Sequence, residues 1–258
     1  MNTKTISQNA LDIIDQFKDF KIGNAVCSIP YYNNKIGALR GALRVEIGKG
    51  SPKDIFEEVQ QLCLKNKIDI NSLKSEELKT ILVDNNIGLD CSAFAYYVLN
   101  EESSSNGKGN LDRHLSFPFC IGFLNKIKCK IRPIENTDVR TFAHNNNSKL
   151  IEIKDVKPGD IITMIGGPDQ NDRDHILIIY RIEYQNFLPS IIYYSHAVSW
   201  PTDGKYGHGI HTGTIGIVNA DKSLIDQIWT ENEKQGNENY THTRAQKSIV
   251  EIRRMNWF

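Results

Sequence analysis

Hydrophobic positions in the N-terminal third of the chain repeat at helical spacing. Among the apolar residues between positions 5 and 20, Ile6, Ala10, Ile13, Ile14 and Phe17 follow this spacing. This spacing predicts an amphipathic helix. A second helix is predicted to begin at Pro52, because Ser51 has a helix-capping side chain and Asp54 makes the first turn acidic. Cys63 lies on the apolar face of that helix, so we expect it in the core.

Two further helical patterns lead to the centre of the chain. One covers residues 75–82, and the stretch Ile-Gly-Leu-Asp at 87–90 then interrupts it. A new helix is predicted over 91–99, with Asp90 as its N-cap. The polar, glycine-containing segment 100–110 predicts a flexible surface loop or insertion rather than a boundary between two domains.

The pattern changes to that of β-strands after Val156. A turn at 157–160 leads into the apolar run 161–164, and a second turn is predicted at 166–168. Four later stretches are rich in Ile, Val, Tyr and Thr: 175–184, 190–200, 209–219 and 248–255. Helices that precede strands predict an α+β domain with an antiparallel sheet.

Length and charge limit the possible functions. A chain of 258 residues is long enough to bury a core, and we expect one domain over 1–258, with a helical extension at about 1–50 and an insertion at about 100–150. The 31 basic and 31 acidic residues balance, so no overall field attracts nucleic acid or anionic lipid. Asp12 and Asp15 interrupt the first apolar stretch, which excludes a signal-peptide core or membrane span there. A cytoplasmic location is expected, and export by another route stays open.

The five cysteines do not form a recognisable framework. They are an odd number at irregular spacing without a C-x-x-C motif, which favours free thiols over disulfides or a zinc site. We expect Cys27, Cys63, Cys120 and Cys129 to be buried core residues. Cys91 differs from them, because it is predicted in the first turn of a helix, where unpaired amides and the helix dipole stabilise a thiolate.

Two histidines complete a possible catalytic group. His175 opens a strongly apolar strand directly after a very polar run, a position from which an imidazole can meet a thiol. His196 follows 21 positions later in the next predicted strand. If the two strands pair as a hairpin, the imidazoles lie side by side and His196 fixes the tautomer of His175.

Several short motifs follow one another between residues 89 and 199. The stretch Leu-Asp-Cys-Ser-Ala-Phe at 89–94 resembles the D-C-S-G-F nucleophile motif of the NlpC/P60 family of cysteine peptidases. Val-Lys-Pro-Gly-Asp-Ile-Ile at 156–162 is similar to its L-x-P-G-D-L motif, and His-Ile-Leu-Ile-Ile-Tyr at 175–180 to its H-V-G-I-Y strand. Ser-His-Ala at 195–197 completes the series. The resemblance covers roughly residues 89–199 with gaps.

The resemblance implies a papain-like α+β fold, with helices packed on a central antiparallel sheet. It also implies hydrolysis of an amide bond in a peptide substrate, a peptidoglycan stem-peptide fragment, by a Cys91-His175-His196 triad without a metal or organic cofactor. The amide of Cys91 would help to hold the oxyanion. Asp90 and Ser92 would contact the free amine of a trimmed peptide. A Pro-Tyr pair of the family matches residues 30–31, with the choice between Tyr31 and Tyr32 left open.

Two positions depart from the family motifs and keep other functions open. Ala93 and Leu177 replace glycines, so side chains occupy space that is normally bare and can alter the substrate. A papain-like acyltransferase or transamidase is one alternative. A catalytically inactive peptide-binding module is another, and it predicts an unreactive Cys91.

Two local patterns suggest metal ligands only weakly. His208 and His211, three positions apart, could be two metal ligands. They lie in a glycine-rich stretch without a nearby cluster of Cys or carboxylates, so a strand turn is the better interpretation. The acidic run at 169–174 lacks the alternating ligands and final glutamate of an EF-hand loop, which favours a solvated loop. No metal site is expected.

Overall fold

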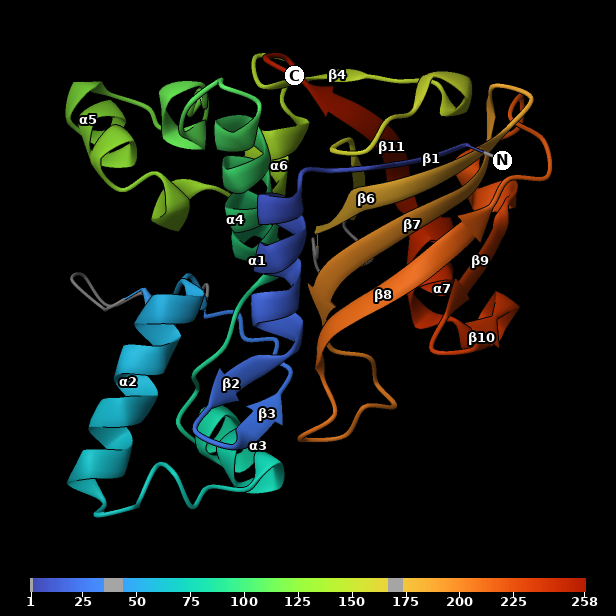
Figure 1. Ribbon diagram of the computed structural model, residues 1–258. Helices are drawn as coiled ribbons and strands as arrows, with labels where there is room; N and C mark the ends of the chain where they lie inside the picture. The colour runs from blue at the N-terminus through green and yellow to red at the C-terminus, as the bar shows by residue number, and fades with distance from the viewer. Residues whose placement is uncertain (1, 35–43, 167–173) are drawn as a thin grey trace.

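The computed structural model describes residues 2–34, 44–166 and 174–258, and its centre is a nine-stranded antiparallel sheet (Figure 1). The strands in their order across the sheet are β10 (Lys234–Gln235), β9 (Ile228–Glu231), β8 (Gly209–Gly216), β7 (Leu188–Val198), β6 (His175–Gln185), β5 (Ile161–Gly166), β11 (Ser248–Met255) and β4 (Ser148–Leu150). The ninth strand, β1 (Asn2–Thr5), pairs with β6. A separate hairpin consists of β2 (Phe20–Ile22) and β3 (Ala25–Cys27).

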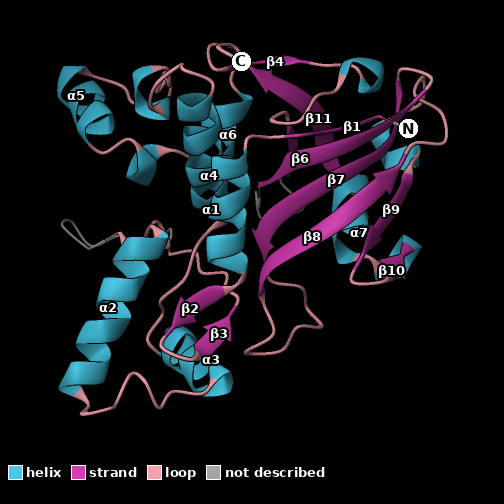
Figure 2. Ribbon diagram, viewed as in Figure 1, coloured by secondary structure: helices cyan, strands magenta, loops and turns pink. Residues whose placement is uncertain are grey.

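Most of the helices lie on one side of the sheet (Figure 2). They are α1 (Gln8–Lys18), α2 (Pro52–Lys65), α3 (Ser75–Asp84), α4 (Cys91–Ser105), α5 (Phe123–Ile131) and α6 (Val139–Ala143). Helix α7 (Tyr240–Gln246) lies behind the sheet in Figure 1. Short 3-10 helices cover Val45–Ile47, Leu111–Arg113, Ile134–Asn136, Ile153–Asp155, Leu224–Asp226 and Gly236–Glu238.

Strand β6 is buried on both faces and separates two hydrophobic cores. Ile176 and Ile178 pack into the core that contains α1 and α4, whereas Leu177 and Ile179 belong to the core on the α7 side. Because side chains alternate along a strand, His175 has the same orientation as Leu177 and belongs to the α7 side. The side of β6 that faces α1 and α4 therefore carries Ile176 and Ile178, whereas the α7 side carries His175 together with Leu177 and Ile179.

The predicted fold class is confirmed: the chain is a mixed α+β protein with a large antiparallel sheet. Ser51 and Asp54 form a reciprocal capping box at the start of α2, and Cys63 is buried. The strands expected at 161–164, 175–184, 190–200, 209–219 and 248–255 correspond to β5, β6, β7, β8 and β11. The narrower expectation of a papain-like fold stays a prediction.

The loop prediction for 100–110 was wrong over its first half, because α4 continues to Ser105. Glu102 explains the difference. Its carboxylate accepts hydrogen bonds from the backbone amide of Ser7 at 2.7 Å and from the side chain of Asn106 at 2.9 Å, so a polar residue is buried in place. Ser7 is 95 residues away in the sequence, so the polarity of residues 100–110 alone could not reveal this partner. The supposed helical extension at 1–50 likewise contains β1, β2 and β3 besides α1.

Two of the cysteines correct the free-thiol prediction. Cys120 and Cys129 form a disulfide that links the approach to α5 with the helix itself. Cys120 is only partly buried, so it is not the core residue that was expected. Cys27, Cys63 and Cys91 are free thiols. Spacing alone did not reveal the pair. The two cysteines are nine positions apart, and the contact depends on how the segment before α5 lies against the helix.

Some expectations fall outside the described residues. The second half of the turn predicted at 166–168, and most of the acidic run at 169–174, belong to the undescribed segment 167–173. Among the residues that the structure describes, no helix is long and apolar enough to cross a membrane.

The packing of α1 against α4 gives a first prediction. Phe17 is fully buried, with its ring 5.9 Å from that of Phe94 and 5.7 Å from that of Tyr97. We expect Phe17→Ala to lower the free energy of unfolding by about 3–5 kcal/mol, because it removes apolar burial and leaves a cavity. Urea denaturation measures the change. Phe187→Ala is the matched control, since Phe187 is 98% exposed, and an equal loss in both variants would contradict this packing.

Candidate active site

Cys91 is the first residue of α4, and the residue before it caps the helix. The Asp90 carboxylate accepts a hydrogen bond from the backbone amide of Ala93 at 2.7 Å. The amides of the first turn are therefore directed at the start of the helix, as predicted. Both Asp90 and Cys91 are buried, each with 4% of its surface exposed.

The thiol lies where two neighbouring strands separate. Pairing between β6 and β7 runs from Gln185 opposite Leu188 to Ile178 opposite Ser195 and stops there. The next part of β6 is consequently free of β7, and the backbone amide of Ile176 is close enough to the Cys91 sulfur to lower its pKa. A side chain from the α4 layer thus reaches the backbone of β6 at Ile176, the residue after His175.

The expectation of a stabilised thiolate is not met in this structure. Burial, reinforced by the negative charge of Asp90, raises the pKa of Cys91 to about 11. The positive charges of Arg244 and Lys49 lower that pKa but do not compensate for burial. The desolvation of a thiolate outweighs the helix dipole here, and the thiol is neutral at rest.

The hairpin of β6 and β7 brings the two imidazoles together as expected. His175 Nε2 lies 2.6 Å from His196 Nδ1, and the two rings are nearly perpendicular. Both side chains are buried. The other nitrogen of His175, Nδ1, is buried and has no hydrogen-bond partner among the described residues.

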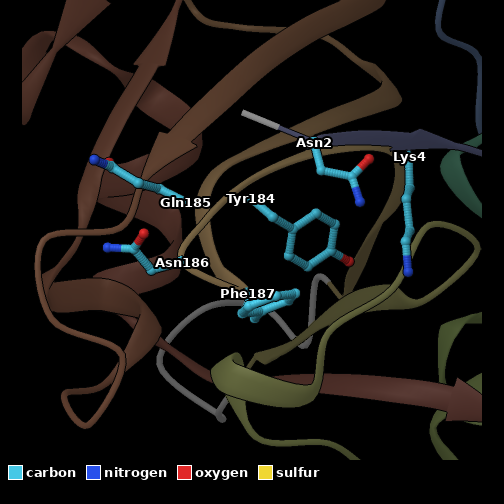
Figure 3. Close-up of a pocket in the computed structure, with 6 residues that line it drawn as sticks. All are labelled: Asn2, Lys4, Tyr184, Gln185, Asn186 and Phe187. Atoms are coloured by element: carbon cyan, nitrogen blue, oxygen red, sulfur yellow. The ribbon is translucent and has the colours of Figure 1, made fainter.

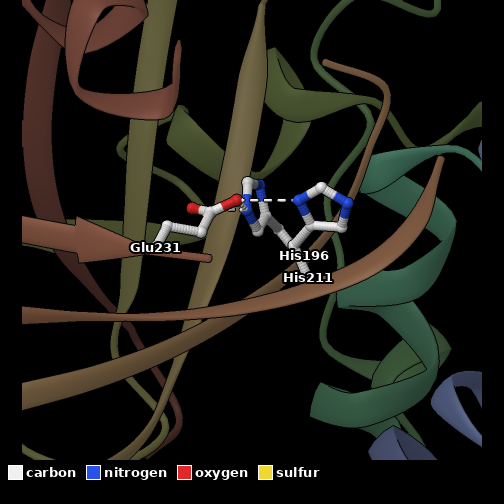
Figure 4. A group of neighbouring side chains, drawn as sticks. All are labelled: His196, His211 and Glu231. Carbon is white, nitrogen blue, oxygen red and sulfur yellow. Dashed lines mark hydrogen bonds and ion pairs between the residues drawn. The ribbon is translucent and has the colours of Figure 1, made fainter. Parts of the chain in front are cut away.

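A carboxylate that the sequence analysis missed completes this group. Glu231, from β9, lies with its two oxygens 3.1 and 3.2 Å from His196 Nε2, and one of them is 2.9 Å from His211 Nδ1 (Figure 4). The hydroxyl of Tyr194 donates to the same carboxylate at 2.7 Å. We call His175, His196 and Glu231 the His–His–Glu chain. No local motif surrounds Glu231, so only strand pairing could have revealed it.

A glycine makes room for this arrangement. Gly213 on β8 lies opposite Tyr194 on one side and Glu231 on the other. A Cβ at position 213 would lie 2.3 Å from the Tyr194 hydroxyl oxygen. The bare backbone therefore lets the phenol reach across β8 to the carboxylate.

The carboxylate determines where the protons of the chain are. An ionised Glu231 only accepts hydrogen bonds, so His196 Nε2 carries the proton that it receives. In a neutral His196, Nδ1 is then an acceptor, and His175 must donate to it from Nε2. The lone pair of His175 is consequently on Nδ1, the buried nitrogen without a partner.

The pKa values of these groups agree with that assignment. Burial lowers the pKa of His175 well below its ordinary value, and the nearby charge of Arg244 lowers it further. Burial alone would raise the pKa of Glu231, but His196, His211 and Tyr194 outweigh it and hold the pKa far below its usual range. The result is a neutral His175 joined through His196 to an ionised Glu231.

Tyr31 lies close to the nucleophile. Burial raises the pKa of Tyr31 first, and the neighbouring Cys91 and Asp90 raise it further. Its backbone pairs with Leu89, just before the nucleophile motif. The backbone amide of Tyr31 donates to His208 Nδ1 at 3.0 Å, which gives His208 a structural partner.

Asp90 and Ser92 have a partner that the sequence analysis did not consider. The Lys49 ammonium lies 2.9 Å from the Asp90 carboxylate and 2.6 Å from the Ser92 hydroxyl. Beside them is a hollow of about 370 Å³, lined also by Asn33, Glu135 and Asp138. A larger hollow of about 600 Å³ lies at the opposite end of the β6–β7 hairpin, where Tyr184 and Phe187 meet Asn2 and Lys4 (Figure 3).

Comparisons with protein-family models, with curated proteins and with solved structures found no match to this chain. The resemblance to the NlpC/P60 peptidases therefore rests on the order of the motifs quoted above.

Metal-binding chemistry is present at one place among the described residues. One ligand atom each of His196, His211 and Glu231 lie within 4.8 Å of one another, and all three residues are buried. The view that His211 has no carboxylate near it was therefore wrong. These ligand atoms already hydrogen-bond to each other, and a metal on His196 Nε2 would displace the proton that orients His175. The arrangement fits the His–His–Glu chain better than a metal centre.

The proton positions can be tested without any substrate. We expect long-range ¹H–¹⁵N spectra to show both His175 and His196 protonated on Nε2. Glu231→Gln replaces an acceptor by an amide that also donates, so the single tautomer of His196 should no longer be enforced. Glu238→Gln, at an exposed glutamate, is the control and should leave the spectrum unchanged. A wild-type His196 protonated on Nδ1 would contradict the assignment.

Proposed function

We propose that this protein is a thiol hydrolase that cleaves an amide bond, with Cys91 as nucleophile and His175 as general base. The observation that carries the proposal is the position of the buried thiol at the backbone amide of Ile176, the residue after His175, whose imidazole is tied through His196 to Glu231. A nucleophile, a base and groups that orient the base are the parts that acyl transfer requires. The order of the NlpC/P60-like motifs supports the same reaction.

The first half of the reaction begins from a neutral pair. The Cys91 proton passes to His175 Nδ1 while the sulfur forms a bond to the substrate carbonyl carbon, and the π electrons of that carbonyl move onto its oxygen. The backbone amide of Cys91, at the start of α4, is available to the oxyanion. The Glu231 charge stabilises the positive charge that develops on the two imidazoles.

The second half of the reaction returns the proton. His175 gives it to the leaving nitrogen as the carbon–nitrogen bond breaks, which leaves an acyl group on Cys91. A water molecule then attacks this thioester, its proton passes to His175, and the sulfur leaves with that proton. Cys91 and His175 finish as they began, so the cycle needs no other reactant.

The proposed substrate is a peptide, and a peptidoglycan stem-peptide fragment is the first choice. This choice rests on the resemblance alone. Acyl transfer to an amine is the second candidate, because Cys91 and His175 are both buried and a site closed to water favours an amine over water as acceptor.

The neutral pair predicts a distinctive pH dependence of Cys91 alkylation by iodoacetamide. In the wild type, His175 accepts the thiol proton, and its depressed pKa keeps it unprotonated, so the rate should be flat near neutrality. The rate should fall only well below pH 6.5, as His175 becomes protonated. In His175→Ala only thiolate reacts, and the rate should rise about tenfold per pH unit toward a pKa of about 11. Mass spectrometry locates the label.

Cys27 is an internal control in the same experiment. Burial raises its pKa to about 11 as well, so its alkylation should rise with pH in both proteins. Equal pH profiles for Cys91 in the wild type and in His175→Ala would contradict the proposed pair and favour a binding module.

Cleavage itself is the direct test of the function. We expect purified stem peptides to be hydrolysed by the wild type, with loss of activity in Cys91→Ala because the acyl–sulfur bond cannot form. Removing His175 should lower the rate by about 10³-fold or more. Mass spectrometry of the products, with and without an added amine, separates hydrolysis from transfer. Alkylation of Cys91 without any cleavage would overturn the choice of substrate.

A further inference from the structure

Three acceptor groups beside the nucleophile, with four oxygen atoms among them, converge on one ammonium group. The Lys49 Nζ lies 3.0 and 2.9 Å from the two Asp90 carboxylate oxygens, 2.6 Å from Ser92 Oγ and 2.9 Å from the Thr137 carbonyl oxygen. We call these three acceptors the ammonium cage. All four residues are buried, with Thr137 only 1% exposed.

The backbone holds Lys49 in this position. Lys49 pairs with Leu89, and the amide of Asp90 donates to the Gly48 carbonyl at 2.9 Å. Gly48 has a φ of +74°, and a Cβ there would lie 2.2 Å from the Tyr32 carbonyl oxygen, so glycine is required. The turn at Gly48 therefore fixes the backbone of Lys49 at a position from which its side chain reaches the cage.

All hydrogen-bonding capacity of the ammonium is used inside the cage. An ammonium has three donors, and the Asp90 carboxylate, the Ser92 hydroxyl and the Thr137 carbonyl take one each. The Ser92 hydroxyl in turn donates to Asp90 at 2.9 Å. Lys49 has no donor left for a ligand, and Asp90 has no uncompensated charge to offer one.

The cage flanks the thiol and borders the hollow of about 370 Å³. Asp90 and Ser92 are the neighbours of Cys91 in the chain, and both line that hollow with Lys49. The resemblance would place the free amine of a substrate on these same two side chains. In this protein a residue of its own chain supplies that amine.

We propose that Lys49 takes the place of a substrate amine, so that the protein acts on peptides whose nitrogen at this hollow is acylated. The inference rests on the proposed function for its enzymatic part. A substrate with a free ammonium there would have to displace Lys49 or lie unpaired beside it, and both cost binding energy. An acylated nitrogen carries no charge and meets no such penalty.

Lys49→Ala should open the cage to an external ammonium. n-Propylammonium replaces the three carbons and the nitrogen that this substitution removes, so it should raise the melting temperature of the variant in a saturable way. Tetramethylammonium has the same charge but no donor, and it should have no such effect. The wild type, whose cage is filled, should respond equally to both salts.

Paired substrates give the enzymatic test. We expect the wild type to cleave an N-acetylated stem peptide at least as well as the same peptide with a free amine. Lys49→Ala should shift the ratio of the two kcat/KM values toward the free amine by about tenfold. A ratio is used because Lys49 also lowers the pKa of Cys91, an effect common to both substrates.

Failure of this proposal can be distinguished from failure of the proposed function. Identical responses of Lys49→Ala to the two salts, or a wild-type preference for the free amine, would overturn the proposal. If neither peptide is cleaved, the proposed function fails while the propylammonium titration still decides the cage. Should Lys49→Ala fold only with propylammonium, that supports the cage. The double variant Lys49→Met with Asp90→Asn leaves no lone charge and should lose the response.

Discussion

An ionised carboxylate in a protein interior must be surrounded by hydrogen-bond donors, and Glu231 meets this requirement with two imidazoles and a phenol from the neighbouring strands. The same contacts that keep the carboxylate buried also fix a proton on His196 Nε2 and, through it, on His175 Nε2. Stability and proton placement therefore depend on one group. Strand pairing supplies its setting, because β7, β8 and β9 bring Tyr194, His211 and Glu231 together, and Gly213 leaves the space between them.

The pKa of the Cys91 thiol is set by burial against the nearby charges and amides. Helix α4 directs the amides of its first turn toward Cys91, but burial raises the pKa of the sulfur more than those amides and the nearby cations lower it. The pair of Cys91 and His175 is thus neutral at rest. Such a pair differs from a preformed ion pair because proton transfer accompanies attack on the substrate. A chain of neutral imidazoles that ends on an ionised carboxylate suits this chemistry, since it stabilises a positive charge only once that charge has formed.

The Lys49 ion pair shows the same principle at Asp90, the residue before the nucleophile. A buried carboxylate at position 90 needs a compensating charge, and the chain provides it from a turn held by Gly48. Two buried carboxylates, Asp90 and Glu231, are thus compensated within the protein, the first by Lys49 and the second by two imidazoles and a phenol. The cage beside the hollow at Asp90 already holds the Lys49 ammonium, which is the basis for expecting an acylated substrate there.

The sequence by itself determined the elements whose signals are local. Capping at Ser51, the helix that begins at Cys91 and the alternating or apolar runs of β5 to β8 and β11 were all predicted, because caps and hydrophobic period depend on neighbours within a few residues. The candidate thiol and its two histidines also followed from motif order. Tertiary structure alone decided the rest. Glu231 and Lys49 carry no motif, the end of α4 depends on Ser7, and the disulfide depends on α5. The pKa of Cys91 was predicted with the wrong sign because burial, unlike a helix start, is a property of the whole fold.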